Sequence, residues 1–130
     1  MANPLLLDIV LFLMNNGVVQ GDGVDAFRDF TPEAPDSIVA LHEYSGDPAV
    51  HYDPTAHRSV QVSVRDKDAD VARHKALRIF KLLQSDNLIV QLTPDRWGQV
   101  HLRQTPFKIG VDKNDRVTYG FNVGITTTVE

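Results

Sequence analysis

The chain has 130 residues, of which 42% are hydrophobic and 23% are charged, which is typical of one globular domain with a core of its own. Its net charge of −4 disfavours a basic phosphate-binding surface, so no sequence-specific nucleic-acid partner is expected. The absence of cysteine excludes disulfides and thiolate chemistry and fits a reducing compartment. We therefore expect a single domain over residues 1–130.

An apolar run from Leu5 to Met14 predicts the first helix, with Asn3 as its N-cap and Pro4 at its first position. The run is too short to span a bilayer and lacks the basic start of a signal peptide, so no membrane association is expected. The inward stripe is expected to be Leu6, Ile9, Val10 and Leu13. The other apolar residues indicate either a helix enclosed in the core or one that faces another subunit. The candidate subunit contacts are Leu7, Leu11 and Phe12.

The next segment predicts two strands and two loops. Residues 24–30 are typical of a short strand, and two prolines make residues 31–36 a loop. Residues 37–44 then alternate in a way that predicts a central strand. Residues 45–56 have no regular pattern and predict a long irregular loop, of the kind that is functional or mobile. Two residues of this loop are candidate partner contacts, Tyr52 and Asp53.

The strongest pattern is a strand that leads directly into an amphipathic helix. Val60, Val62 and Val64 share one face of the strand, and an apolar period of three to four residues predicts a helix over 69–83 with Asp68 as its N-cap. The expected inward face of this helix is Ala69, Ala72, Ala76, Ile79 and Leu83. A basic stripe on the outer face is usually only solvated, but it also suits an acidic neighbour. Its residues are candidate contacts: Lys75, Arg78 and Lys81.

The C-terminal third is predicted to be rich in strands. Short strands are expected at 88–92 and 99–103, and a turn at 112–115 joins residues 108–111 to a long strand over 117–129. The apolar face of this strand is Val117, Tyr119, Phe121, Val123 and Ile125. The strand exceeds the usual length, so its far end is expected to extend past the sheet as an edge that seeks a partner. Two candidate contacts lie there, Thr127 and Val129.

The sequence contains short matches to catalytic and ligand-binding motifs, but the residues around each match do not suit the chemistry. The glycine-rich turn at 21–26 would face a pyrophosphate with two carboxylates. The alternating aspartates at 66–70 begin like a calcium loop, but Val71 occupies the position that needs glycine. The five histidines never fall at three- or four-residue spacing, and no serine lies in a nucleophile-elbow sequence. We therefore expect no enzyme and predict no catalytic, cofactor-binding or metal-binding residues.

Several segments together carry a resemblance to a known family. They are the apolar first helix, the loop Pro32–Asp36, the strand ending Glu43–Gly46, the junction of strand Arg58–Arg65 with helix Ala69–Leu83, and the turn Lys108–Arg116. With these features the chain resembles the tail-terminator and minor-capsid (tail-completion) proteins of long-tailed bacteriophages. The turn departs from the family pattern, because Asn114-Asp115 replaces the usual glycine before Arg116.

The resemblance implies an α+β fold in which a mixed, largely antiparallel sheet is flanked by the N-terminal helix and the central amphipathic helix. It also implies a virion protein, assembled in the host cytoplasm, that forms a hexameric ring on the head-proximal end of the tail tube. The ring would end tube polymerisation and join the tail to the head connector, so the partners would be further copies of this chain, the tail tube protein and the connector or neck proteins. No catalytic residues are implied.

Two other functions remain open at this point. A neck or head-completion protein of the same virion would share the size and the lack of catalytic motifs. A small ligand-binding or enzymatic α+β domain would instead have one concave pocket with convergent polar groups. Measurement of the mass in native buffer discriminates a ring from a monomeric domain.

Overall fold

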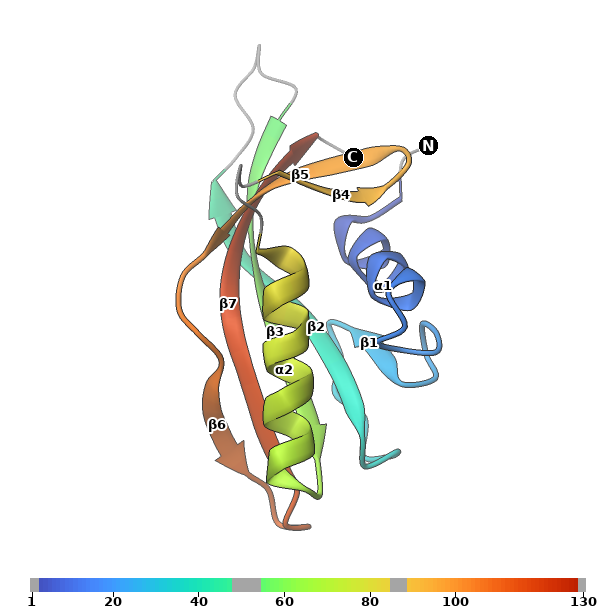
Figure 1. Cartoon of the computed structure of the whole chain (residues 1–130), viewed down its shortest axis with the longest axis vertical. Helices are drawn as coiled ribbons and strands as arrows, with labels where there is room; N and C mark the ends of the chain where they lie inside the picture. The colour runs from blue at the N-terminus through green and yellow to red at the C-terminus, as the bar shows by residue number, and fades with distance from the viewer. Residues whose placement is uncertain (1–2, 48–54, 85–88, 129–130) are drawn as a thin grey trace.

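The computed structural model describes residues 3–47, 55–84 and 89–128, which form one α+β domain of two helices and seven strands (Figure 1). In chain order the elements are α1 (Leu5–Asn15), β1 (Ala26–Arg28), β2 (Ile38–Asp47), β3 (Thr55–Asp66), α2 (Ala69–Leu83), β4 (Ile89–Thr93), β5 (Arg96–Leu102), β6 (Phe107–Val111) and β7 (Val117–Thr128). The α+β fold class and the flanking positions of both helices are confirmed.

All seven strands belong to one sheet with the order β1-β2-β3-β7-β5-β4. β6 pairs with the first part of β7, and β5 pairs with the later part. Only β1 and β2 are parallel, and every other pair is antiparallel. The longest pairing joins β3 to β7, from Thr55 opposite Thr128 to Asp66 opposite Val117. The sheet is therefore mixed and largely antiparallel, as the sequence led us to expect.

The position of β7 corrects one expectation. The sequence predicts that its far end is a free edge, but its whole length pairs with β3 on one side, while its other side pairs first with β6 and then with β5. The strand is long because it spans two shorter strands placed end to end. Its excess length is therefore used inside the sheet, and the prediction of a partner-seeking edge at this strand is wrong.

Both helices cover the same face of the sheet. α2 packs against β3 and β7, whereas α1 packs against β4, β1 and β2 (Figure 1). The predicted valines of β3 are buried in this core, and Phe80 of α2 meets Phe121 of β7 edge to face at 5.4 Å between ring centroids. The opposite face of the sheet carries no helix among the described residues. One face thus holds the main core, and the other is available for other contacts.

The bounds of α2 agree with the predicted helix over 69–83. The carboxylate of Asp68 accepts hydrogen bonds from the amides of Asp70 at 2.9 Å and Val71 at 3.4 Å, so the predicted N-cap is confirmed. Ala69 is an exception to the predicted inward face. It is exposed because the first turn precedes the contact with the sheet, and Ala72 is the first buried residue of the helix.

The start of α1 differs from the prediction. Pro4 occupies the N-cap position and no side chain caps the helix, so Asn3 is not the cap. The side-chain amide of Asn3 instead donates to the carboxylate of Asp8 at 3.0 Å. This carboxylate also forms a buried ion pair with Arg96 of β5 at 3.0 Å. Arg96 also donates to the carbonyl oxygen of Asn3 at 2.8 Å. Asn3 therefore forms hydrogen bonds with both members of the buried ion pair that joins α1 to β5.

Several predicted bounds shift by a few residues. β2 continues to Asp47 and β3 begins at Thr55, so both strands extend into the predicted loop 45–56, and residues 48–54 lie outside the described part of the chain. β5 begins three residues before the predicted Gln99, at Arg96. The charge of Arg96 conceals this start in the sequence, because a buried arginine with an ion-pair partner does not appear in an apolar pattern.

Candidate functional site

The predicted contact residues fall into three groups. Five side chains are exposed or half-buried and stay candidates: Leu7, Leu11, Lys75, Arg78 and Lys81. Two are not at the surface, because Phe12 is 8% exposed within the core and Thr127 is 0% exposed with its hydroxyl donating to the carbonyl of Trp97 at 2.7 Å. As surface contacts these two are wrong. Three lie outside the described residues: Tyr52, Asp53 and Val129.

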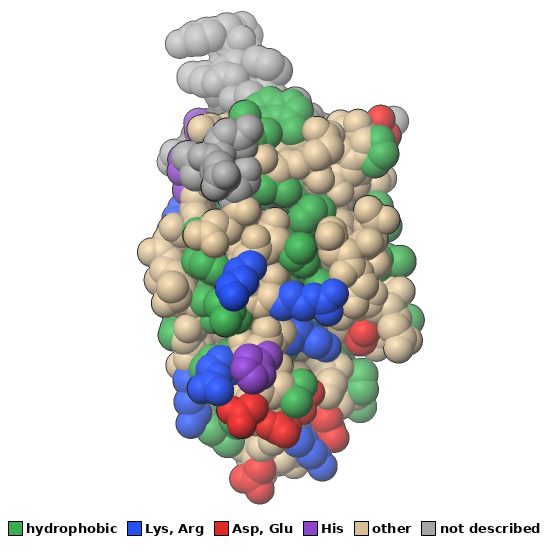
Figure 2. Space-filling view, in the orientation of Figure 1, with side chains coloured by type: hydrophobic (Ala, Val, Ile, Leu, Met, Phe, Trp, Pro, Cys, Tyr) green, Lys and Arg blue, Asp and Glu red, His purple; other side chains and the backbone are tan. Residues whose placement is uncertain are grey.

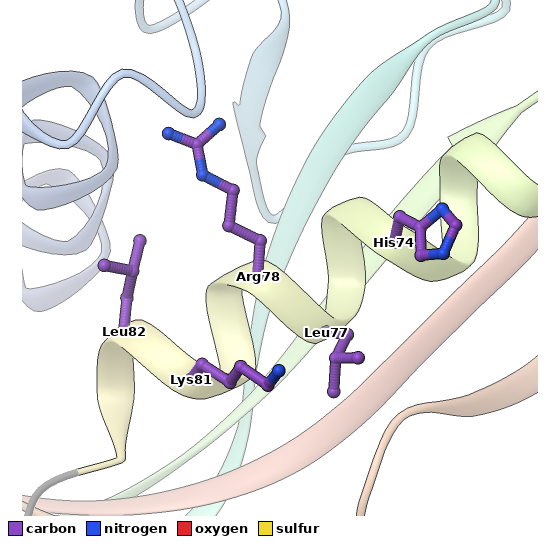
Figure 3. Close-up of a pocket in the computed structure, with 5 residues that line it drawn as sticks. All are labelled: His74, Leu77, Arg78, Lys81 and Leu82. Atoms are coloured by element: carbon purple, nitrogen blue, oxygen red, sulfur yellow. The ribbon is translucent and has the colours of Figure 1, made fainter.

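The exposed face of α2 has a hollow of about 420 Å³, here called the α2 groove (Figure 3). Its lining residues are His74, Leu77, Arg78, Lys81 and Leu82. These positions are spaced by three or four residues, so they form one stripe along the outer side of the helix. Figure 2 shows Lys and Arg side chains gathered in the middle of this face, with Asp and Glu side chains toward its lower end.

Arg78 has an internal role in addition to its exposure. Its guanidinium donates to the carbonyl oxygen of Asn16 at 2.8 Å and to that of Gly17 at 3.5 Å, just past the end of α1 (Figure 3). A cation suits this position, because the last carbonyls of a helix carry partial negative charge. Arg78 therefore joins the two helices, and its orientation in the α2 groove is fixed.

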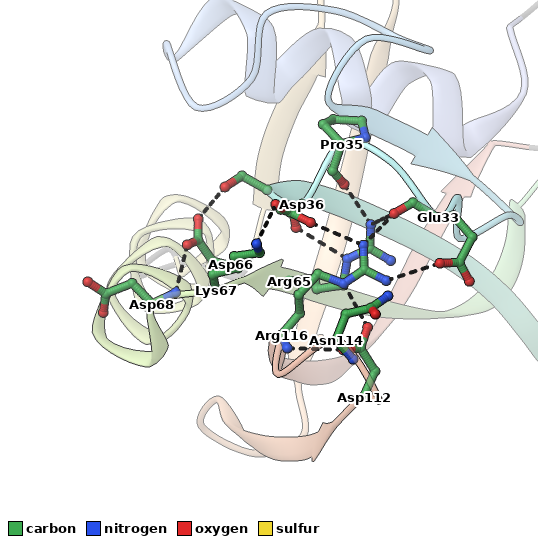
Figure 4. A network of polar contacts seen from close by, with 11 residues as sticks. Glu33, Pro35, Asp36, Arg65, Asp66, Lys67, Asp68, Asp112, Asn114 and Arg116 are labelled. Carbon is green, nitrogen blue, oxygen red and sulfur yellow. Dashed lines mark hydrogen bonds and ion pairs between the residues drawn. The ribbon is translucent and has the colours of Figure 1, made fainter.

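A second polar cluster, here called the arginine hub, lies where the loop 31–36 meets Arg65 of β3 and Arg116 just before β7 (Figure 4). Arg65 of β3 donates to the carbonyl oxygens of Pro32 and Pro35, each at 2.7 Å, and to that of Asp36 at 3.2 Å. Arg116 is 3% exposed, and its guanidinium donates to Asp112 at 2.8 Å and to the carbonyl of Glu33. The hub fastens the loop 31–36 to the ends of β3 and β7.

The charges of the hub change the acidity of its members. Hydrogen bonds from the backbone amide and the guanidinium of Arg116 hold the pKa of Asp112 below its usual value, although burial opposes this shift. Burial and the neighbouring Arg116 charge lower the pKa of Arg65. For Arg116 burial acts in the same direction, but the hydrogen bond and charge of Asp112 together with the charges of Glu33 and Asp36 raise its pKa. The hub is thus a structural cluster in which carboxylates surround a buried arginine.

We expect Asp112→Asn to reduce the acid sensitivity of the fold. Because the folded-state pKa of Asp112 is lowered, its ionised form stabilises the protein above the unfolded value of about 4, and this stabilisation is lost as the pH falls through the folded value. Urea unfolding at pH 7, 4 and 3 should show a less stable variant at pH 7 with a weaker pH dependence. Asp115→Asn is the control, and equal pH dependence in the parent and Asp112→Asn would contradict the assignment.

The strand β6 carries an apolar surface that the sequence reading missed. Phe107, Ile109 and Val111, here called the β6 patch, are 40%, 43% and 52% exposed. β6 pairs with β7 on one side only and is an edge strand among the described residues. The sequence pattern that could have indicated this patch is the spacing of the three residues by two, which places them on one face of the strand. A strand at the edge of a sheet also has no partner strand on its outer side.

The open face of the sheet is polar where β2, β3, β7 and β5 run side by side. Arg103 lies across Gly124 and donates to the hydroxyl of Ser59 at 3.0 Å, and its other terminal nitrogen lies 3.5 Å from the Tyr44 hydroxyl. A side chain at position 124 would meet Arg103 at 3.1 Å, so glycine makes room for the guanidinium. This arrangement orders the face but brings together no nucleophile and base.

Among the described residues (3–47, 55–84 and 89–128), no group of three or more His, Asp or Glu side chains is placed to hold a metal ion. No helix in these ranges is both long enough and apolar enough to cross a membrane. Three surfaces of the described residues are candidates for contact: the α2 groove, the β6 patch and the outer side of α1.

Comparison with known proteins identifies the family. No curated protein matches the chain. A family model described as bacteriophage tail terminator protein matches residues 12–129, a range that includes α2, every strand and both arginines of the hub. The match agrees with the resemblance carried by the strand–helix junction and the turn before Arg116. This chain therefore belongs to the bacteriophage tail terminator family, whose members are structural components of the phage tail.

Proposed function

We propose that this protein forms a ring of about six copies at the head-proximal end of the tail tube. There the ring ends polymerisation of the tube and offers a surface to the head connector. The observation that carries the proposal is the family match over residues 12–129. The protein acts by shape and contact and not by catalysis, and its partners are further copies of itself, the tail tube protein and the connector.

The placement of exposed apolar residues supports a ring. A head-to-tail ring needs two different patches on each subunit, because each copy contacts its two neighbours through different surfaces. One is the β6 patch, and the other is the outer stripe of α1, here called the α1 patch, which consists of Leu7, Leu11 and Met14. α1 and β6 lie on opposite sides of the molecule (Figure 1), as neighbouring contacts in a ring require.

We expect Ile109→Asp to abolish the ring while the protomer stays folded. Ile109 is 43% exposed in the β6 patch, so the carboxylate remains hydrated in the free protomer but would be buried without a partner in an apolar subunit contact. Particles assembled with the variant should show tails of excess and variable length and few joined heads. Electron microscopy of the particles and native mass measurement provide the readout.

Val24→Asp is the matched control, because Val24 is an exposed apolar residue outside both patches. It should leave ring formation and tail length unchanged. Parent particles with no ring at the junction of tail and head would remove the proposed function. A ring at that junction with normal tails of uniform length in the Ile109→Asp particles would instead remove the β6 patch from the interface. A ring found only on the head side, without any effect on tail length, would favour a neck or head-completion protein.

A further inference from the structure

The α2 groove combines apolar and cationic side chains. Leu82 packs in part against the core, whereas Leu77 is a half-buried leucine on the outer stripe of the helix. Leu77 and Leu82 are half-buried and line the hollow together with Lys81, Arg78 and His74 (Figure 3). On the exposed side of a surface helix polar residues are expected along such a stripe. Figure 3 shows Arg78 and Lys81 between the two leucines, an arrangement that suits a ligand with both an apolar group and negative charge.

The cationic side chains of the groove have hydrogen-bond donors that the described residues do not use. Lys81 has no ion-pair partner among the described residues, and neither does the neighbouring Lys75. Arg78 is held in place by the carbonyls of Asn16 and Gly17, which use two of its three guanidinium nitrogens. No carboxylate lines the hollow. The groove is therefore a basic site on a chain whose net charge is −4.

Among the described residues, most carboxylates of a second copy would be engaged within their own protomer. Many of the described carboxylates already have partners within the protomer, either arginine side chains or backbone amides. The pairs with arginine are Asp8–Arg96, Asp22–Arg28, Glu43–Arg58, Asp70–Arg73 and Asp112–Arg116. Asp68 caps α2, and Asp25 accepts from the amides of Gln20 and Gly21. An acidic ligand from a different protein therefore fits better than a second copy.

We propose that the α2 groove binds a short acidic segment of another protein of the virion, with an apolar side chain against Leu77 and carboxylates on Lys81 and Arg78. The identity of the partner as a virion protein rests on the proposed function. The groove shares no residue with the α1 patch or the β6 patch, so its occupation by this partner does not use the proposed ring contacts. Charge attraction accelerates the encounter, and the apolar contact retains the bound segment.

The test uses particles assembled with a photo-crosslinking amino acid in place of Leu77, and in a second variant in place of Leu82. Mass spectrometry of the linked peptides identifies what occupies the groove. We expect a segment of another virion protein that contains at least two Asp or Glu residues next to an apolar one. Lys81→Glu should reduce this crosslink at least fivefold, while Lys113→Glu in the exposed turn between β6 and β7 should leave it unchanged.

Four results would overturn the inference: no crosslink, a crosslink to a second copy or to the same chain, a linked segment without carboxylates, or an unchanged yield with Lys81→Glu. Each of these can be separated from failure of the proposed function, because the ring and the tail length are observed in the same particles. If the ring forms and tails have uniform length but the groove is empty, only the inference fails. Thermal unfolding of Lys81→Glu confirms that the variant is folded.

Discussion

Val62→Asp is expected to prevent folding. Val62 of β3 is completely buried on the face of the sheet that the helices cover, so an aspartate there would place an unpaired carboxylate in the core. The cost of burying such a charge is several kcal/mol, which is comparable with the whole stability of a domain, about 5–15 kcal/mol. Circular dichroism should show loss of helix and sheet signal at 25 °C, together with loss of the cooperative thermal transition.

Ser63→Asp is the matched control on the adjacent residue. Ser63 points to the open face of the sheet, where its hydroxyl donates to the carbonyl of Ala40 at 3.2 Å. The substitution removes this hydrogen bond, which is worth about 1 kcal/mol, but leaves the carboxylate near water. The variant should remain folded with a modestly lower melting temperature. Equal effects of the two substitutions would show that the two faces of β3 are assigned incorrectly.

Gly120→Val is expected to destabilise the sheet by about 3 kcal/mol or more. A Cβ atom at position 120 would lie 2.3 Å from the carbonyl oxygen of Val62 and 2.9 Å from the Cδ1 atom of Ile109. The first of these atoms belongs to the backbone of β3, so the overlap is relieved only if the central pair β3–β7 moves apart. The midpoint of urea unfolding should fall strongly, with little change in the slope.

Gly110→Ala is the control for this substitution, because a Cβ atom at position 110 would have no neighbour within 4 Å. Gly110 lies in β6, which pairs with the same part of β7. Its unfolding midpoint should differ little from that of the parent. A Gly120→Val variant as stable as Gly110→Ala would show that the close approach of β3 and β7 at this point is absent in solution.

The secondary structure of the central unit is predictable because its signals are local. The period changes from two residues to three or four between Val64 and Ala72, and Asp68 stands where the helix needs a cap. The position of β7 in the sheet is not predictable in this way. Its half-polar alternation is typical of an edge or a one-sided strand, and only the pairing with β3, β5 and β6 shows that it is central.

The candidate contact surfaces were predictable only in part. The basic stripe of α2 is visible as spacing, and two of its residues, Arg78 and Lys81, line the α2 groove. Phe12 was misassigned because an all-round apolar helix does not indicate which sides its own chain covers. The arginine hub joins residues about 30 to 80 positions apart in sequence, and no local pattern predicts such a contact.

The central place of β7 has a consequence for how the protein is made. Without β7 the sheet separates into β1–β2–β3 and β4–β5, and β6 loses its partner. β7 follows all the other strands in the chain, so before residues 117–128 are translated no strand lies between the two half-sheets, and the helices are what joins them. β3 then has no partner strand on its β7 side. We therefore expect folding of this domain to be completed only after translation of β7, with apolar strand surface exposed until then.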